Sequence, residues 1–204
     1  ELHSIAVIMK TLKPAYDRLD EIYEGLTTNE DDRSVGSVPH PERNKYGEWA
    51  WRCEIQTSNQ GPLAGYTVAI KDSIAVRGLP ARIGGEIFEG FVSTEDATVV
   101  KRVLEAGATI IGKTTCEDLC FSGGSHTSLP EPVRNPWNTA RHAGGSSSGN
   151  AVAIATGQTD MSIGGDTGGS IRTPASWCGI VGLKPTFGLV PYKGSAAMEP
   201  SLDH

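Results

Sequence analysis

The segment from Gly144 to Lys184 constrains this chain most, because it twice places serine hydroxyls directly after paired glycines. The two serine clusters are Ser146-Ser147-Ser148 and Ser170. Glycine lets the backbone approach a ligand closely and adopt conformations that other residues avoid. A serine in this setting is either a turn residue or a nucleophile with backbone N–H groups directed past it. The second interpretation makes the chain an enzyme and requires a base.

A candidate base lies upstream, in the stretch Gly65–Ser73. Residues 66–70 are mostly β-branched or apolar and are bounded by glycine and a charged turn, which predicts a short buried strand. Lys71 comes at the end of this strand, where a side chain can point into a cleft. A lysine accepts a proton only when its neutral form is populated, and a dry pocket favours that form. Considered alone, Lys71 is equally an ordinary lysine at a strand terminus.

Four blocks of the sequence extend this pattern, and they are Ala69–Asp72, Gly144–Ser147, Gly165–Arg172 and Gly179–Pro185. In this order and at this spacing they resemble the amidase signature family, from about residue 61 to the C-terminus. The resemblance implies an α/β fold in which helices wrap a mixed β-sheet.

The resemblance also assigns roles to residues. It implies that Ser170 is the nucleophile, Lys71 the ultimate base and Ser146 a bridging serine that follows a cis peptide bond. It implies an oxyanion hole formed by the backbone N–H groups of Thr167, Gly168, Gly169 and Ser170. The residues expected to support the site are Gly145, Ser147, Asp166 and Arg172, the last two as a brace for the nucleophile loop. Ser148 departs from the family, which commonly has glycine at that place. No metal and no organic cofactor is implied.

The implied chemistry is amide hydrolysis. A serine hydroxyl needs a neighbouring base to attack at neutral pH. Neutral Lys71 would draw a proton from Ser146 as Ser146 draws one from Ser170, which attacks the amide carbonyl. Ser146 would then return a proton to the leaving nitrogen, and water would hydrolyse the acyl-enzyme by the same relay.

Other interpretations of these motifs are weaker. The segment 68–71 spells the VAIK strand of protein kinases, but the sequence has no kinase glycine loop before it and no HRD or DFG segment after it. The segment 145–149 fits the G-x-S-x-G elbow of α/β-hydrolases, but residues 141–144 do not spell the buried strand that an elbow follows. Neither a P-loop nor a dinucleotide fingerprint is present, and apolar residues recur too regularly for a glycine-rich linker.

The composition bounds the partners. The chain has 24 acidic and 18 basic residues, a net charge of −6, so nucleic acid is not an expected partner. No apolar run approaches membrane-spanning length and no signal peptide is evident, which predicts no membrane association and a cytoplasmic protein. Cys116 and Cys120 would share one face of a helix as small core residues, and the four cysteines show no metal-ligand spacing.

Secondary structure alternates along the chain. Residues 4–26 have the apolar spacing of a helix that Pro14 should interrupt, and residues 1–60 are predicted to be a helical appendage with a connecting loop. An ordered patch is expected at 49–55. Ser93 or Asp96 is expected to cap a helix that runs through Ala106, with a strand at 108–111. A helix at 150–156 and a buried strand at 161–164 complete the pattern.

The family's domain is about twice as long as this chain, so residues 61–204 are expected to form its N-terminal half. We therefore expect a complementary C-terminal chain of the same amidase as a partner, beside a small-molecule amide substrate, and the resemblance allows a homo-oligomer of the completed unit. Within the family, Cys116–Gly123 and Pro185–Tyr192 resemble bacterial small-amide amidases, some of them enantioselective. The alternative is the A subunit of a tRNA-dependent amidotransferase, whose D-E-F-A-M-G-S-S-T segment is absent here.

Overall fold

The computed structural model describes Lys10, Lys13, Pro14, Arg18, Arg33, residues 35–196, Met198 and Leu202. The chain divides into two compact units, Glu1–Asp32 and Arg33–His204. The four described residues of the first unit are all helical, and the rest of the helix predicted over 4–26 lies outside the described residues.

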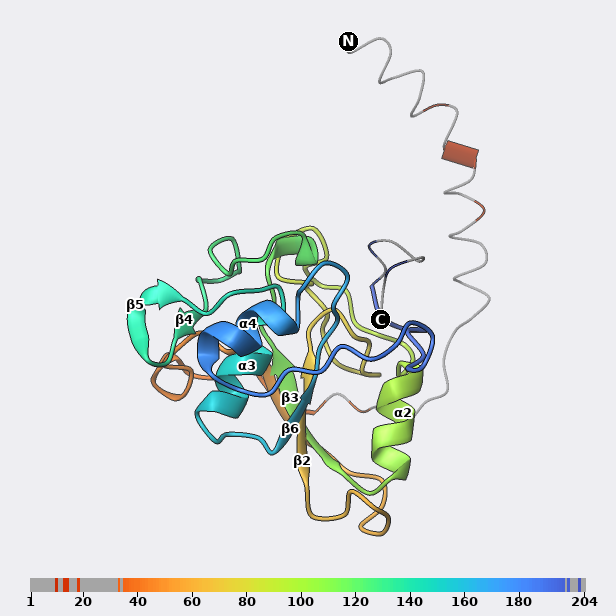
Figure 1. Cartoon of the computed structure of the whole chain (residues 1–204). Helices are drawn as coiled ribbons and strands as arrows, with labels where there is room; N and C mark the ends of the chain where they lie inside the picture. The colour runs from red at the N-terminus through yellow and green to blue at the C-terminus, as the bar shows by residue number, and fades with distance from the viewer. Residues whose placement is uncertain are drawn as a thin grey trace. The chain divides into compact units, whose positions relative to one another are not determined.

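The second unit is built on a mixed four-stranded sheet (Figure 1). Its strands are β1 (Trp49–Ile55), β2 (Thr67–Lys71), β3 (Thr109–Thr114) and β6 (Met161–Ile163), in the spatial order β1-β3-β2-β6. β2 runs parallel to both β3 and β6, whereas β1 runs antiparallel to β3. The α/β fold class with a mixed sheet is therefore confirmed.

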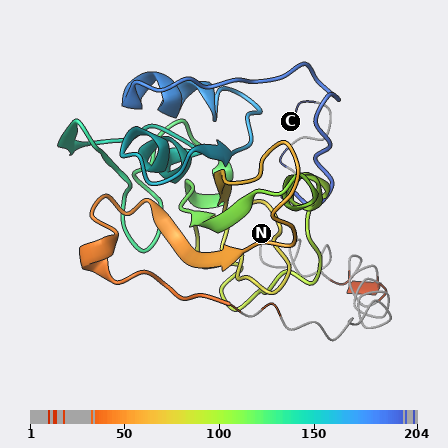
Figure 2. The same cartoon turned by 90° about the horizontal axis from the view of Figure 1, so that it is seen from below.

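Short elements surround this sheet. The helices are α2 (Thr98–Glu105), α3 (Ser148–Ala155) and α4 (Arg172–Cys178), and a hairpin pairs β4 (Arg134–Asn135) with β5 (Asn138–His142). Two single-turn 3-10 helices, η1 (Pro41–Arg43) and η2 (Asp118–Cys120), lie in the connections. In both Figures 1 and 2, α2 lies at one side of the strands and α3 and α4 at the other.

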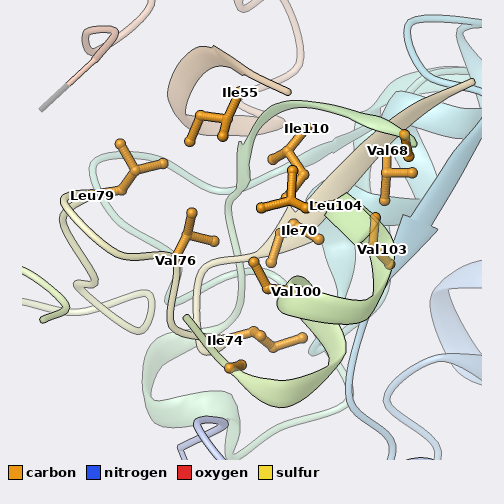
Figure 3. Close-up of a cluster of buried hydrophobic side chains, with 12 residues drawn as sticks. Ile55, Val68, Ile70, Ile74, Val76, Leu79, Val100, Val103, Leu104 and Ile110 are labelled. Atoms are coloured by element: carbon orange, nitrogen blue, oxygen red, sulfur yellow. The ribbon is translucent and has the colours of Figure 1, made fainter. Parts of the chain in front are cut away.

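The alternation of side chains along β2 sets the two faces of the sheet. Val68 and Ile70 belong to a buried cluster with Val100, Val103 and Leu104 of α2, which Figure 3 shows facing the strands. Burying each such side chain stabilises the fold by about 1.5–3 kcal/mol.

Ala69, between these two residues, packs instead with Ala153 of α3 on the opposite face. Lys71 has the same parity as Ala69, so its side chain emerges on the face that α3 covers. Gly149 permits this close packing, because a Cβ there would overlap the carbonyl oxygen of Glu48 and lie 2.8 Å from the amide nitrogen of Thr115.

The helix predicted to end at Ala106 is α2, but the predicted capping is wrong. Its N-cap is Ala97, and no side chain caps it. The Asp96 carboxylate instead accepts the Arg77 N–H at 2.8 Å and pairs with Arg33 at 2.5 Å. These contacts use both carboxylate oxygens to fix the loop before the helix.

Two further expectations differ from the structure. The segment 161–164 was expected to be a buried strand, but β6 is half-buried and lies at the edge of the described sheet. A division was expected near residue 60, whereas β1 pairs with β3 and so lies in the same sheet as β2. Its antiparallel pairing with a strand more than 50 residues later is not visible in local sequence.

Candidate active site

The carboxyl ends of the parallel strands gather the candidate residues. β2 ends at Lys71, and β6 ends at Ile163, directly before the loop that carries Ser170. Ligands of open α/β sheets bind outside the carboxyl ends of strands. A cleft is found there, and Lys71, Ser146 and Ser170 all line it. The three residues predicted to act in catalysis therefore lie around one cavity.

Lys71 and Ser146 are in direct contact. Nζ of Lys71 donates a hydrogen bond to Oγ of Ser146 at 2.7 Å, and both side chains are almost fully buried, at 1% and 0% exposure. The peptide bond between Gly145 and Ser146 is cis, as the resemblance implied. Gly145 has no room for a side chain, because a Cβ would overlap the carbonyl oxygen of Gly124.

The next two serines have different surroundings. Ser147 donates its N–H to the carbonyl oxygen of Ser170 at 3.0 Å and its Oγ to that of Gly165 at 3.2 Å. It thus joins the start of α3 to both ends of the nucleophile loop. Ser147 is the N-cap of α3, but its hydroxyl makes no capping bond. Oγ of Ser148 is buried and has no hydrogen-bond partner.

Asp166 organises the nucleophile loop. Its carboxylate accepts N–H groups from Gly169 at 2.8 Å, Ile171 at 3.0 Å and Arg172 at 3.2 Å. The Arg172 guanidinium adds two further bonds, at 3.0 and 2.9 Å. Burial acts to raise the pKa of Asp166, but these bonds outweigh it and lower the pKa from 3.8 to about 2. The pair expected to brace the loop is therefore in contact.

The contacts of Asp166 bear on the expected oxyanion hole. The N–H of Gly169 points to the carboxylate, so in this structure that donor is already engaged. Gly169 has φ of +132°, a conformation that side chains rarely adopt. Thr167 and Ser170 line the cleft, and Gly168 between them is exposed.

A buried ion pair beside Lys71 was missed by sequence reasoning. Nζ of Lys113 lies 3.0 Å from Oδ1 of Asp72 and donates to the backbone oxygens of Asp72 at 3.0 Å and Pro80 at 2.8 Å. Oδ2 of Asp72 accepts the N–H groups of Arg82 at 2.9 Å and Ile83 at 2.7 Å. Lys113 stands in a strand without a motif, so only the fold reveals its partner.

Asn150 was also missed, although its position could have suggested a structural role. Its Oδ1 accepts Oγ1–H of Thr114 at 2.7 Å, and its Nδ2 donates to the backbone oxygen of Ile163 at 2.9 Å. The amide therefore ties the ends of β3 and β6 to the first turn of α3. This contact holds Ser146, four residues earlier, above the sheet edge.

Within the described part of the chain, no group of three or more His, Cys, Asp and Glu side chains is arranged to hold a metal ion.

No helix among residues 35–196 and the other described positions is both long enough and apolar enough to cross a membrane.

Comparison with known proteins places these features among relatives. The family model described as Amidase matches residues 47–204. An enantioselective amidase of Rhodococcus rhodochrous is 49% identical over 193 residues, which are 93% of this chain and 37% of that protein. The chain thus spans little more than a third of this curated relative.

Solved structures agree with the fold. The A subunit of the glutamyl-tRNA(Gln) amidotransferase of Thermotoga maritima matches with a TM-score of 0.70 and 42% identity, over 74% of this chain and 33% of that one. The peptide amidase of Stenotrophomonas maltophilia matches with a TM-score of 0.66 and 37% identity, over 71% of this chain and 30% of that one.

Proposed function

This chain belongs to the amidase signature family, and we propose that it supplies the catalytic residues of an amide hydrolase. The single observation that carries the proposal is the 2.7 Å contact between Lys71 and Ser146 in a cleft that Ser170 also lines. A buried lysine and a buried serine in contact, beside a half-buried serine, form a path along which a proton can leave the outer hydroxyl.

In the proposed reaction the free amine of Lys71 accepts the Ser146 proton, so the 2.7 Å contact carries a proton in either direction. Ser146 takes the proton of Ser170, whose Oγ bonds to the amide carbonyl carbon. The C–N bond then breaks as Ser146 gives its proton to the leaving nitrogen, which departs as ammonia when the substrate is a primary amide. Water attacks the resulting ester through the same relay and releases the carboxylic acid.

The negative charge on the carbonyl oxygen needs hydrogen-bond donors during both steps. We propose that the N–H groups of Thr167, Gly168, Gly169 and Ser170 supply them, as the resemblance implies. Because Asp166 already engages Gly169, that donor serves the oxyanion only as a shared bond or after a small shift of the loop. Losing one donor of this kind typically lowers the rate about 100- to 1000-fold.

We propose a small carboxamide as the substrate rather than a glutamine bound in an amidotransferase. The Rhodococcus rhodochrous relative is named an enantioselective amidase and matches across 93% of this chain at 49% identity. The alternative draws on relatives such as the amidotransferase A subunit of Exiguobacterium sibiricum, at 39% identity over 96% of this chain.

The remainder of the fold is part of the proposal. β6 is an edge strand, and the groove beside it is lined by Ile171, Ile180, Val181 and Leu183 among others. Val181 and Leu183 are 95% and 76% exposed. An apolar surface of this kind at a sheet edge is suited to further packing. We propose that a further segment of the amidase, on the same or a separate polypeptide, covers it and completes a domain that begins before residue 61.

The test is release of ammonia from a panel of aliphatic and aryl carboxamides by the full-length protein, with Ser170→Ala as the matched control. Hydrolysis that the variant lacks supports the amidase. Hydrolysis of glutamine only when amidotransferase partner subunits are added would replace the small-amide function by the alternative. Equal activity of both proteins would overturn the role of Ser170.

A further inference from the structure

Two cysteines lie against the candidate active site, and the chemistry proposed above does not use them. Cys120 lines the same cleft as Lys71, Ser146 and Ser170. It is partly exposed, whereas Cys116 is fully buried. Both are free thiols.

The backbone directs Cys120 toward this cleft. The expectation that Cys116 and Cys120 share a helical face is wrong, because only Asp118–Cys120 form a single 3-10 turn and Cys116 precedes it. Leu119 and Cys120 both adopt left-handed φ angles, of 49° and 59°. Consecutive left-handed residues other than glycine are uncommon and cluster at functional sites. This turn replaces the regular helix that would have carried Cys120 away from the cleft.

The surroundings of Cys120 favour its thiolate. The hydrogen bond with Cys116 lowers the pKa of Cys120 most, burial opposes this, and the charge of Lys71 and the hydroxyls of Ser73 and Ser146 lower it further. The Lys71 contribution exists only while Lys71 is protonated, whereas the hydrogen bonds act in either state. The same pairing raises the pKa of Cys116, which therefore keeps its proton.

The other two cysteines provide a contrast within the same chain. Burial raises the pKa of Cys53 to about 12 and that of Cys178 to about 11. Because the thiolate is the reactive form of cysteine, neither should react readily with an oxidant.

We propose that Cys120 is an oxidation site for hydrogen peroxide, with Cys116 as its resolving thiol. The Cys120 sulfur attacks one peroxide oxygen, the O–O bond breaks, and the hydroxide that leaves takes up a proton to become water. Cys120 is then a sulfenic acid. The Cys116 sulfur attacks the Cys120 sulfur and loses its proton, the hydroxyl departs with a proton as a second water, and a disulfide forms. One peroxide is reduced for each pair of thiols oxidised.

This inference rests on the proposed function only for its consequence. Because Cys120 shares the cleft with Lys71 and Ser146, oxidation there changes the space in which an amide would react. A reductant that restores the thiols should restore amide hydrolysis. The thiol chemistry itself needs no amidase activity and can be measured without a substrate.

The experiment treats the reduced full-length protein with hydrogen peroxide at neutral pH and follows each cysteine by peptide mass spectrometry. In the wild type we expect a Cys116–Cys120 disulfide, formed at least about tenfold faster than any oxidation of Cys53 or Cys178. In Cys116→Ala the sulfenic acid should persist on Cys120 and be trapped by dimedone. Cys120→Ala should form neither product, and Cys178→Ala should behave as the wild type.

The outcomes separate the two proposals. Oxidation of Cys120 no faster than that of Cys53 would overturn the inference, as would a sulfenic acid that persists in the wild type although Cys116 is present. If the disulfide forms but the reduced protein hydrolyses no amide, the thiol site stands and the proposed function fails. If amides are hydrolysed but Cys120 is inert, the reverse holds.

Discussion

Nζ of Lys71 lies 2.7 Å from Oγ of Ser146, although 75 residues separate them in the chain. The contact depends on three local features. The parity of β2 turns Lys71 toward the face that α3 covers, the absence of a side chain at Gly145 lets the loop approach Gly124, and Asn150 fixes the first turn of α3 to the sheet edge.

Replacing Lys71 tests the proposed base. Lys71→Met keeps a similar apolar stem and removes the amine, so we expect kcat for amide hydrolysis to fall about 100- to 10,000-fold with little loss of thermal stability. Steady-state kinetics and thermal unfolding measure the two effects. Activity within about threefold of the wild type would exclude Lys71 as the base.

Lys113→Met is the matched control, since Lys113 is also a buried strand lysine. It leaves the Asp72 carboxylate without its cation, and removing one partner of a buried ion pair typically costs about 3–5 kcal/mol. We therefore expect a clear loss in the free energy of unfolding, measured by urea denaturation. An unchanged value would show that the pair does not stabilise the fold.

The serine cluster divides into one catalytic and one dispensable hydroxyl. Ser146→Ala interrupts the proposed relay and should lower kcat at least about 100-fold. Ser148→Ala removes a buried hydroxyl that has no partner, so its stability should be unchanged or higher by up to about 1 kcal/mol. Comparable loss of activity in both variants would contradict separate roles.

The nucleophile loop should be sensitive to acid through Asp166. Its pKa is lowered from 3.8 to about 2, so its contribution to stability is complete above about pH 4 and is lost as the pH falls toward 2. In Asp166→Asn this dependence is absent. Urea unfolding at intervals between pH 5 and pH 2.5 should give a steeper decline for the wild type than for the variant. Parallel curves would show that Asp166 does not contribute in this range.

The groove beside β6 should respond differently in two contexts. Leu183→Lys places a charge on a side chain that is 76% exposed here, so residues 1–204 alone should become more soluble and bind less of an apolar dye. In the full-length protein the same change should lower the thermal midpoint, because the charge would be buried. No change in the full-length protein would mean that this surface stays uncovered.

The sequence predicted the site better than the frame around it. Serines and lysine between glycines carry their signal in a few adjacent residues, so Lys71, Ser146 and Ser170 could be proposed before their positions were known. Asp72 and Lys113 could not be paired, because neither stands in a pattern and only the parallel pairing of β2 with β3 places them together.

The errors in secondary structure have the same origin. Asp96 looks like an N-cap from sequence, but its carboxylate bonds to Arg77 and Arg33, the latter 63 residues away. Cys116 and Cys120 have helical spacing, but the left-handed turn at Leu119 and Cys120 is not encoded by a glycine. Tertiary contacts decided these segments.

The most direct test of the central claim is to label the full-length protein with a fluorophosphonate and locate the adduct by peptide mass spectrometry. A nucleophilic Ser170, activated through Ser146 and Lys71, should carry the adduct, and Ser170→Ala should abolish it. Labelling should also weaken strongly in Lys71→Met. An adduct on Ser147, or labelling of Ser170 that persists unchanged in Lys71→Met, would contradict the proposed relay.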